Sequence, residues 1–269
     1  MKKFSPVLKK LGASLAWAIW TCGVLFLVQL LLSLLFSWLL KIFHISISPT
    51  LAQAIFSLLS YAIAILIIFL VPPKIFKKLS RITTTELGLN GLPTWTDIGL
   101  SIVGLLVYLL LAAVFTSIFS VFPWFDISES QDVGFGTILS PVDRIIVFLI
   151  LCVIAPIAEE VVFRGFLYQK IKALFFKKNS SEQRTRSQKK KLSFITKREL
   201  LAISIATFIT SLAFGIMHGQ WNVGVNVFAM SIVLCFMREI TGSIYAGIIL
   251  HIIKNTIAFY LVYIALVGF

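Results

Sequence analysis

Three ionisable side chains, Glu159, Glu160 and Arg164, lie within six residues of one another in a segment that is otherwise apolar. The hydrophobic run around them is long enough to cross a bilayer. An ionised group at mid-bilayer costs from about 3 to more than 10 kcal/mol, so such groups are rare away from functional sites. We therefore expect a functional site here, with the carboxylates as candidates for general acid–base chemistry.

Helix geometry separates the two carboxylates. Glu160 and Arg164 are four residues apart, so they share a face and can form an intrahelical ion pair. Glu159 points about 100° away from its neighbour and can face another helix. Because one guanidinium cannot fully serve both carboxylates, we predict a catalytic role for Glu159. Glu160 is either a second catalytic residue or the partner in a structural ion pair.

Two further apolar runs carry imidazoles. His218 lies one turn after Phe214 at the end of one run, and His251 lies one turn before Asn255 within another. A buried carboxylate can take a proton from water, an imidazole can orient that water, and an amide can stabilise an oxyanion. This set of groups suits peptide hydrolysis. We expect Lys254, beside Asn255, to snorkel or to pair with another group.

The same side chains are also a possible zinc site. One glutamate and two histidines, here Glu159, His218 and His251, are the ligand set of a catalytic zinc with an open position. The chain lacks an HExxH sequence, which excludes a zincin-type site, and it lacks the Gly-x-Ser-x-Gly of many serine hydrolases. A zinc-assisted and a metal-free mechanism both stay open.

Three motifs on three hydrophobic helices together resemble the CAAX-protease and bacteriocin-processing (CPBP) family of intramembrane endopeptidases, which includes type II CAAX prenyl endopeptidases. The motifs are Glu159-Glu160-x-x-x-Arg164, Phe214-x-x-x-His218 and His251-x-x-x-Asn255. Two shorter segments also look like this family, Glu86-Leu87-Gly88-Leu89 and Arg238-x-x-Thr241-Gly242-Ser243. The resemblance covers about residues 140–260.

The resemblance implies a role for each motif residue. Glu159 would activate water together with His218, and His251 and Asn255 would stabilise the oxyanion. The remaining motif residues, Glu160, Arg164 and Phe214, would shape the site. The family is named as metallopeptidases, and a glutamate-based mechanism without metal has also been argued for it, so the resemblance leaves the zinc question open.

Long apolar helices must position these residues. The 269 residues are 59% hydrophobic, and the apolar residues fall in long runs. We predict an all-α polytopic transmembrane bundle with seven or eight spans and its active site in an intramembrane cavity. The chain has 24 Lys and Arg residues and 11 Asp and Glu residues. The basic residues gather in loops between the runs, which fits the positive-inside rule and excludes nucleic-acid binding.

The loops also predict orientation and domains. Basic loops alternate with neutral or acidic ones, which places the N-terminus in the cytoplasm. We divide the chain into an N-terminal transmembrane hairpin with a basic loop, residues 1–94, and a catalytic membrane domain, residues 95–269, with a basic cytoplasmic insertion at 177–198. Glu159 lies about 24 Å inside its span, whereas His218 ends the next span. They can meet only if helices are tilted or offset, or if the fifth span begins before Leu200.

We therefore predict an integral protein of a prokaryotic cell membrane that hydrolyses peptide bonds, in CAAX-type or bacteriocin processing or in self-immunity. The expected partners are membrane lipid and a peptide or protein substrate. The main alternative is an ion-coupled transporter that uses the same buried Glu and His groups, although the chain shows no repeat symmetry. A non-catalytic membrane protein that has kept the fold is a third possibility.

Overall fold

The computed structural model describes residues 6–44, 46–75, 82–129, 135, 140–175 and 196–265. These residues form helices without β-strands: α1 (Pro6–Ile42), α2 (Pro49–Ile75), α3 (Thr84–Leu87), α4 (Trp95–Phe119), α5 (Pro141–Phe148), α6 (Ala155–Glu160), α7 (Tyr168–Phe175), α9 (Lys197–Ile216), α10 (Trp221–Thr241) and α11 (Tyr245–Tyr260). Three π-helical segments, η1 (Leu149–Ile154), η2 (Val161–Leu167) and η3 (Leu261–Ala265), extend or connect them.

Seven helical stretches of the described chain are long and apolar enough to cross a membrane. This confirms the predicted all-α polytopic bundle. The insertion at 177–198 lies almost wholly outside the described residues, as do parts of the other basic loops. The cytoplasmic N-terminus and the domain boundary after residue 94 stay predictions.

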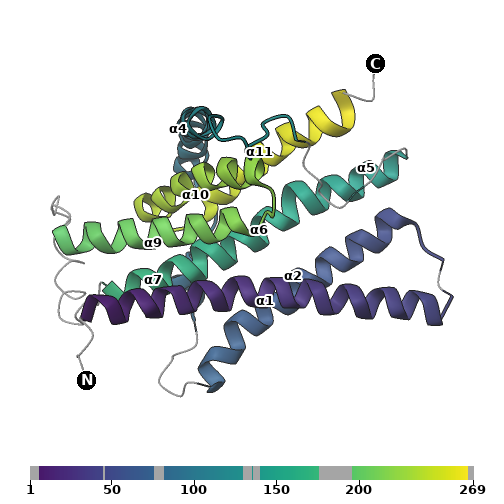
Figure 1. Cartoon of the computed structure of the whole chain (residues 1–269), viewed down its shortest axis with the longest axis horizontal. Helices are drawn as coiled ribbons and strands as arrows, with labels where there is room; N and C mark the ends of the chain where they lie inside the picture. Colours follow the sequence, from purple (N-terminus) through teal and green to yellow (C-terminus); the bar gives the residue numbers. More distant parts are fainter. Residues whose placement is uncertain are drawn as a thin grey trace.

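The elements from α5 to α7 form one continuous helical span, Pro141–Phe175, which crosses the middle of the bundle (Figure 1). Helices α1, α7 and α9 lie side by side, and α10 packs between α9 and α4. Small residues bring α9 and α10 close together, because a Cβ at Gly215 would meet the Gly224 carbonyl oxygen at 2.8 Å. The core lies among these helices, whereas α1 and α4 expose large apolar side chains such as Leu31 and Leu110, as lipid-facing helices do.

The span that carries the carboxylates is irregular for a local reason. Pro156 has no N–H, and the η1 and η2 segments flank the short α6 turn that contains it. In η1 the Ala155 N–H donates to the Ile150 carbonyl, five residues back. The next donor in this register would be the nitrogen of Pro156, so the Leu151 carbonyl has no backbone partner of this kind. π-Helical turns of this type are frequent at functional sites.

The two shorter family-like segments meet at one end of the bundle. Thr83 caps α3 through a capping box with Glu86, and Gly88 ends it with φ of +81°. The Arg238 guanidinium donates to the Glu86 carbonyl oxygen at 2.9 Å, and the Ile244 N–H donates to the Gly88 carbonyl at 3.1 Å. This contact fixes α3 against the junction of α10 and α11, outside the predicted site.

Candidate active site

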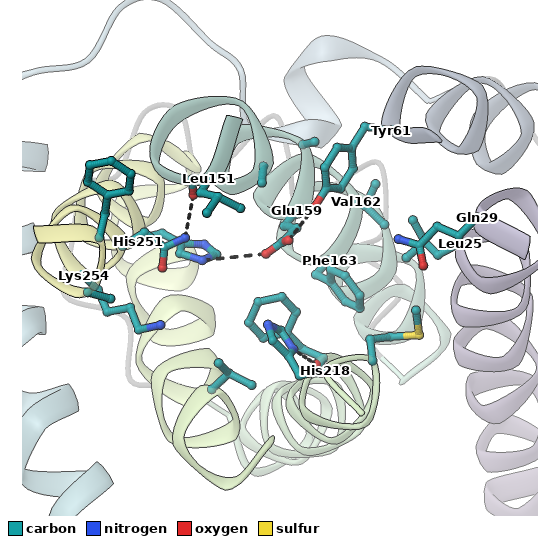
Figure 2. Close-up of a pocket in the computed structure, with 18 of the residues that line it drawn as sticks. Leu25, Gln29, Tyr61, Leu151, Glu159, Val162, Phe163, His218, His251 and Lys254 are labelled. Atoms are coloured by element: carbon teal, nitrogen blue, oxygen red, sulfur yellow. Dashed lines mark hydrogen bonds and ion pairs between the residues drawn. The ribbon is translucent and has the colours of Figure 1, made fainter. Parts of the chain in front are cut away.

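A cavity of about 540 Å³ lies between the spans and is lined by residues of all three motifs. Glu159 comes from α6, His218 follows α9, and His251 and Asn255 come from α11. Tyr61 of α2 and Lys254 of α11 also line it (Figure 2). Of the alternatives that the sequence left open for bringing Glu159 and His218 together, the earlier start is confirmed, because α9 begins at Lys197, before Leu200.

The Glu159 carboxylate faces the cavity and contacts two other helices. The Tyr61 hydroxyl donates to its Oε1 at 2.9 Å, and its Oε2 lies 3.7 Å from the His251 Nε2. About 20% of the Glu159 side chain is exposed, against none of the Glu160 side chain. Glu159 is therefore the motif carboxylate that water or a substrate can reach.

His251 lies between the two carboxylates and is buried. Its Nδ1 lies 3.2 Å from the Glu160 Oε1, and its Nε2 faces Glu159. An ionised carboxylate can only accept a hydrogen bond, so the contact with Glu160 fits a proton on Nδ1. This contact fixes the ring with Nε2 toward Glu159 (Figure 2).

Glu160 and Arg164 form the predicted intrahelical ion pair, 2.8 Å between Oε1 and Nη1, with both side chains buried. Neither residue lines the cavity. The Arg164 guanidinium also lies over the Phe214 ring, 4.4 Å from its centroid, which is cation–π geometry. The same ring meets the edges of His218 and His251, at 5.0 Å and 6.0 Å between centroids. The pair and Phe214 thus support the two imidazoles from behind.

His218 lies in the short connection between α9 and α10. Its Nδ1 is 2.9 Å from the Phe214 carbonyl oxygen, which can only accept, so the proton belongs on Nδ1. Burial lowers the pKa of the His218 imidazole below its usual value, and the nearby Glu159 carboxylate opposes that shift. A neutral ring with an unprotonated Nε2 at the cavity can accept a hydrogen bond from water.

Asn255 bonds to the irregular helix. Its Nδ2 donates to the Leu151 carbonyl oxygen at 2.9 Å, the carbonyl for which Pro156 supplies no N–H. One amide hydrogen therefore ties α11 to the span that carries Glu159. Asn255 also lines the cavity.

Sequence reasoning missed Tyr61. It lies in the second span, which contains no recognisable motif, and a single tyrosine in an apolar helix is unremarkable. Only its position in space, opposite Glu159, marks it. The sequence contained a better signal for Lys254, a cation within an apolar helix beside a motif residue, but could not place its ammonium group in the cavity.

The predicted zinc ligands do not form a metal site as they are arranged. Within the described part of the chain, no three His, Cys, Asp or Glu side chains come together in a group that could hold a metal ion. His251 uses its two nitrogens toward Glu160 and Glu159, and the Nδ1 of His218 faces a carbonyl oxygen.

This fold and this cavity define a class: a polytopic helical membrane protein with a carboxylate and two imidazoles around one internal cavity. Residues 141–257 match a family model described as type II CAAX prenyl endopeptidase Rce1-like. The matched part of the chain contains all three motifs, and the match confirms the resemblance seen in the motifs. The matched family is one of endopeptidases. Neither the comparison with curated proteins nor that with solved structures found a match.

Proposed function

We propose that this protein is an intramembrane endopeptidase that cleaves a CAAX-type or similar membrane-bound peptide, with Glu159 as the general base. One observation carries the proposal: the Glu159 carboxylate and the His218 and His251 imidazoles line one cavity within a membrane bundle of this family. Processing of a prenylated protein, processing of a bacteriocin and self-immunity are settings that the same reaction would serve.

The proposed reaction uses one water molecule. Glu159 takes a proton from the water while the water oxygen attacks the scissile carbonyl carbon. The other O–H of the water donates a hydrogen bond to the His218 Nε2. The Tyr61 hydroxyl holds the carboxylate in place, and His251 attracts it when both ring nitrogens are protonated. The proton on Glu159 then passes to the leaving amine as the peptide bond breaks. An amide hydrogen of Asn255 would stabilise the oxyanion, and His251 would join it when its Nε2 also carries a proton.

Substitution of the base tests this proposal. Glu159→Gln removes the proton acceptor and keeps the shape, so we expect cleavage to fall by about 100- to 10,000-fold, while the protein still inserts into membranes. His218→Ala and His251→Ala should also abolish cleavage. Glu199→Gln, near the start of α9 and away from the cavity, is the matched control and should cleave like the unmodified protein. Normal cleavage by Glu159→Gln would remove the proposed function.

The metal question needs its own measurement. We propose the metal-free reaction, so cleavage by protein purified in detergent should be unchanged by a chelator, and metal analysis should find no stoichiometric zinc. If the chelator stops cleavage and zinc restores it, Glu159, His218 and His251 become the ligands to test. Loss of zinc binding in each alanine variant would then support a zinc-assisted mechanism in place of the metal-free one.

A further inference from the structure

Lys254 places a positive charge in the cavity that the proposed reaction does not use. It lies on α11, one turn after His251, and its ammonium group points into the space beside the two imidazoles (Figure 2). Among the described residues it takes part in no ion pair or hydrogen bond. The Glu159 carboxylate is close enough to attract it electrostatically, but its direct contacts are with Tyr61 and His251.

The charge cannot reach a membrane surface along its own helix. The span runs from Tyr245 to Ile264, so Lys254 lies about 14 Å from one end and about 15 Å from the other at 1.5 Å per residue. A four-carbon stem does not cover that length. Because a cation at this depth without a hydrogen-bonded partner is costly, an anionic group bound in the cavity would stabilise it.

We propose that Lys254 binds the free carboxylate at the C-terminus of the peptide substrate. This inference rests on the proposed function, since it names what occupies the same cavity. A peptide lying at this depth has few acidic side chains, because each is costly in the membrane, but every peptide has one terminal carboxylate. An ammonium group one turn from His251 would hold that terminus beside the reacting groups, so cleavage would fall within a few residues of the C-terminus.

Peptide binding to an inactive protein tests this separately from catalysis. The Glu159→Gln protein is placed in nanodiscs of phosphatidylcholine, which carries no net charge. Three fluorescent peptides with a farnesylated cysteine three residues before the end are titrated: a free acid, a C-terminal amide, and an amide whose last residue is glutamate. We expect the free acid to bind about tenfold more tightly than either amide, the size typical of a hydrogen bond between charged groups.

Variants in the same background assign that preference to a residue. Lys254→Met should reduce the ratio of acid to amide affinity to about 1, and Lys254→Arg, which keeps the charge, should keep most of it. Lys41→Met removes the same charge at the exposed end of α1 and should leave the ratio unchanged. Thermal unfolding of each variant checks that the fold is kept.

Two results would overturn the carboxylate site: equal binding of acid and amide by the Glu159→Gln protein, or a preference that survives in Lys254→Met. Tight binding of the amide ending in glutamate would overturn the assignment to the chain terminus. A preference that depends on Lys254, in a protein whose unmodified form cleaves none of the peptides, would support the carboxylate site and remove the endopeptidase. Cleavage of the peptides without a preference for the free acid would support the endopeptidase and remove the carboxylate site.

Discussion

Glu159 and Glu160 are neighbours in the chain, but they belong to two regions with different physical properties. Glu160 lies in a closed cluster with Arg164, the Nδ1 side of His251 and the Phe214 ring, and both charged side chains of this cluster are buried. Glu159 faces the open cavity, with a hydroxyl and the other side of the same imidazole as its contacts. His251 connects the two regions.

The difference shows how one helix separates structure from chemistry. A charge that is buried with a fixed partner is neutralised and cannot exchange protons with a ligand. A charge beside a cavity, with neutral partners, remains available. We therefore interpret the closed cluster as the support that orients His251, and the cavity as the place where bonds are broken.

The largest effect should come from breaking the closed cluster. Arg164→Leu leaves the Glu160 carboxylate buried without its cation, so we expect a loss of about 3–5 kcal/mol in the free energy of unfolding. Unfolding in detergent by heat or by denaturant measures this. Glu159→Gln, in the other region, should unfold like the unmodified protein.

The double variant Glu160→Gln with Arg164→Leu removes both charges and should recover most of that loss. Equal stability of Arg164→Leu and the unmodified protein would contradict a closed cluster. Recovery of stability without recovery of cleavage would show that Glu160 is also needed to orient His251.

These two regions differ in how far they follow from the sequence. The four-residue spacing of Glu160 and Arg164 predicts their ion pair, because local helix geometry sets it. The apolar runs predict the bundle, and the family motifs predict that His218 and His251 come near Glu159. The Tyr61 contact depends on how α2 crosses the span of Glu159, and no local pattern encodes such a crossing. The bond from Asn255 to Leu151 follows from the missing N–H of Pro156, but its donor lies 104 residues away.

An intermediate effect should come from crowding the closed cluster. A Cβ at Gly247 would lie 3.1 Å from the Glu160 Oε2 and 3.4 Å from the Leu234 Cδ2. Gly247→Ala should therefore lower the free energy of unfolding by about 1–3 kcal/mol, as overpacking does. Because the displaced carboxylate orients His251, cleavage should fall as well.

Gly99→Ala is the matched control, since a Cβ at that helical position meets nothing within 4 Å. It should be at least as stable as the unmodified protein, because alanine is the better helix former. If Gly247→Ala unfolds and cleaves like Gly99→Ala, the closed cluster has room to adjust and does not fix the orientation of His251.

The smallest effect on stability should come from the cavity side. Tyr61→Phe removes the hydroxyl that donates to the Glu159 Oε1, so we expect a loss of about 1 kcal/mol in stability and about tenfold in cleavage, the rate equivalent of roughly 1.4 kcal/mol. Tyr108→Phe is the matched control, because it removes a similar hydrogen bond, to the Asn226 Oδ1 of α10. Tyr108 and Asn226 do not line the cavity. The two variants should therefore match in stability and differ in cleavage. If both variants cleave like the unmodified protein, the Tyr61 hydroxyl does not orient Glu159. The position of the Glu159 carboxylate would then depend on His251, and through it on the closed cluster.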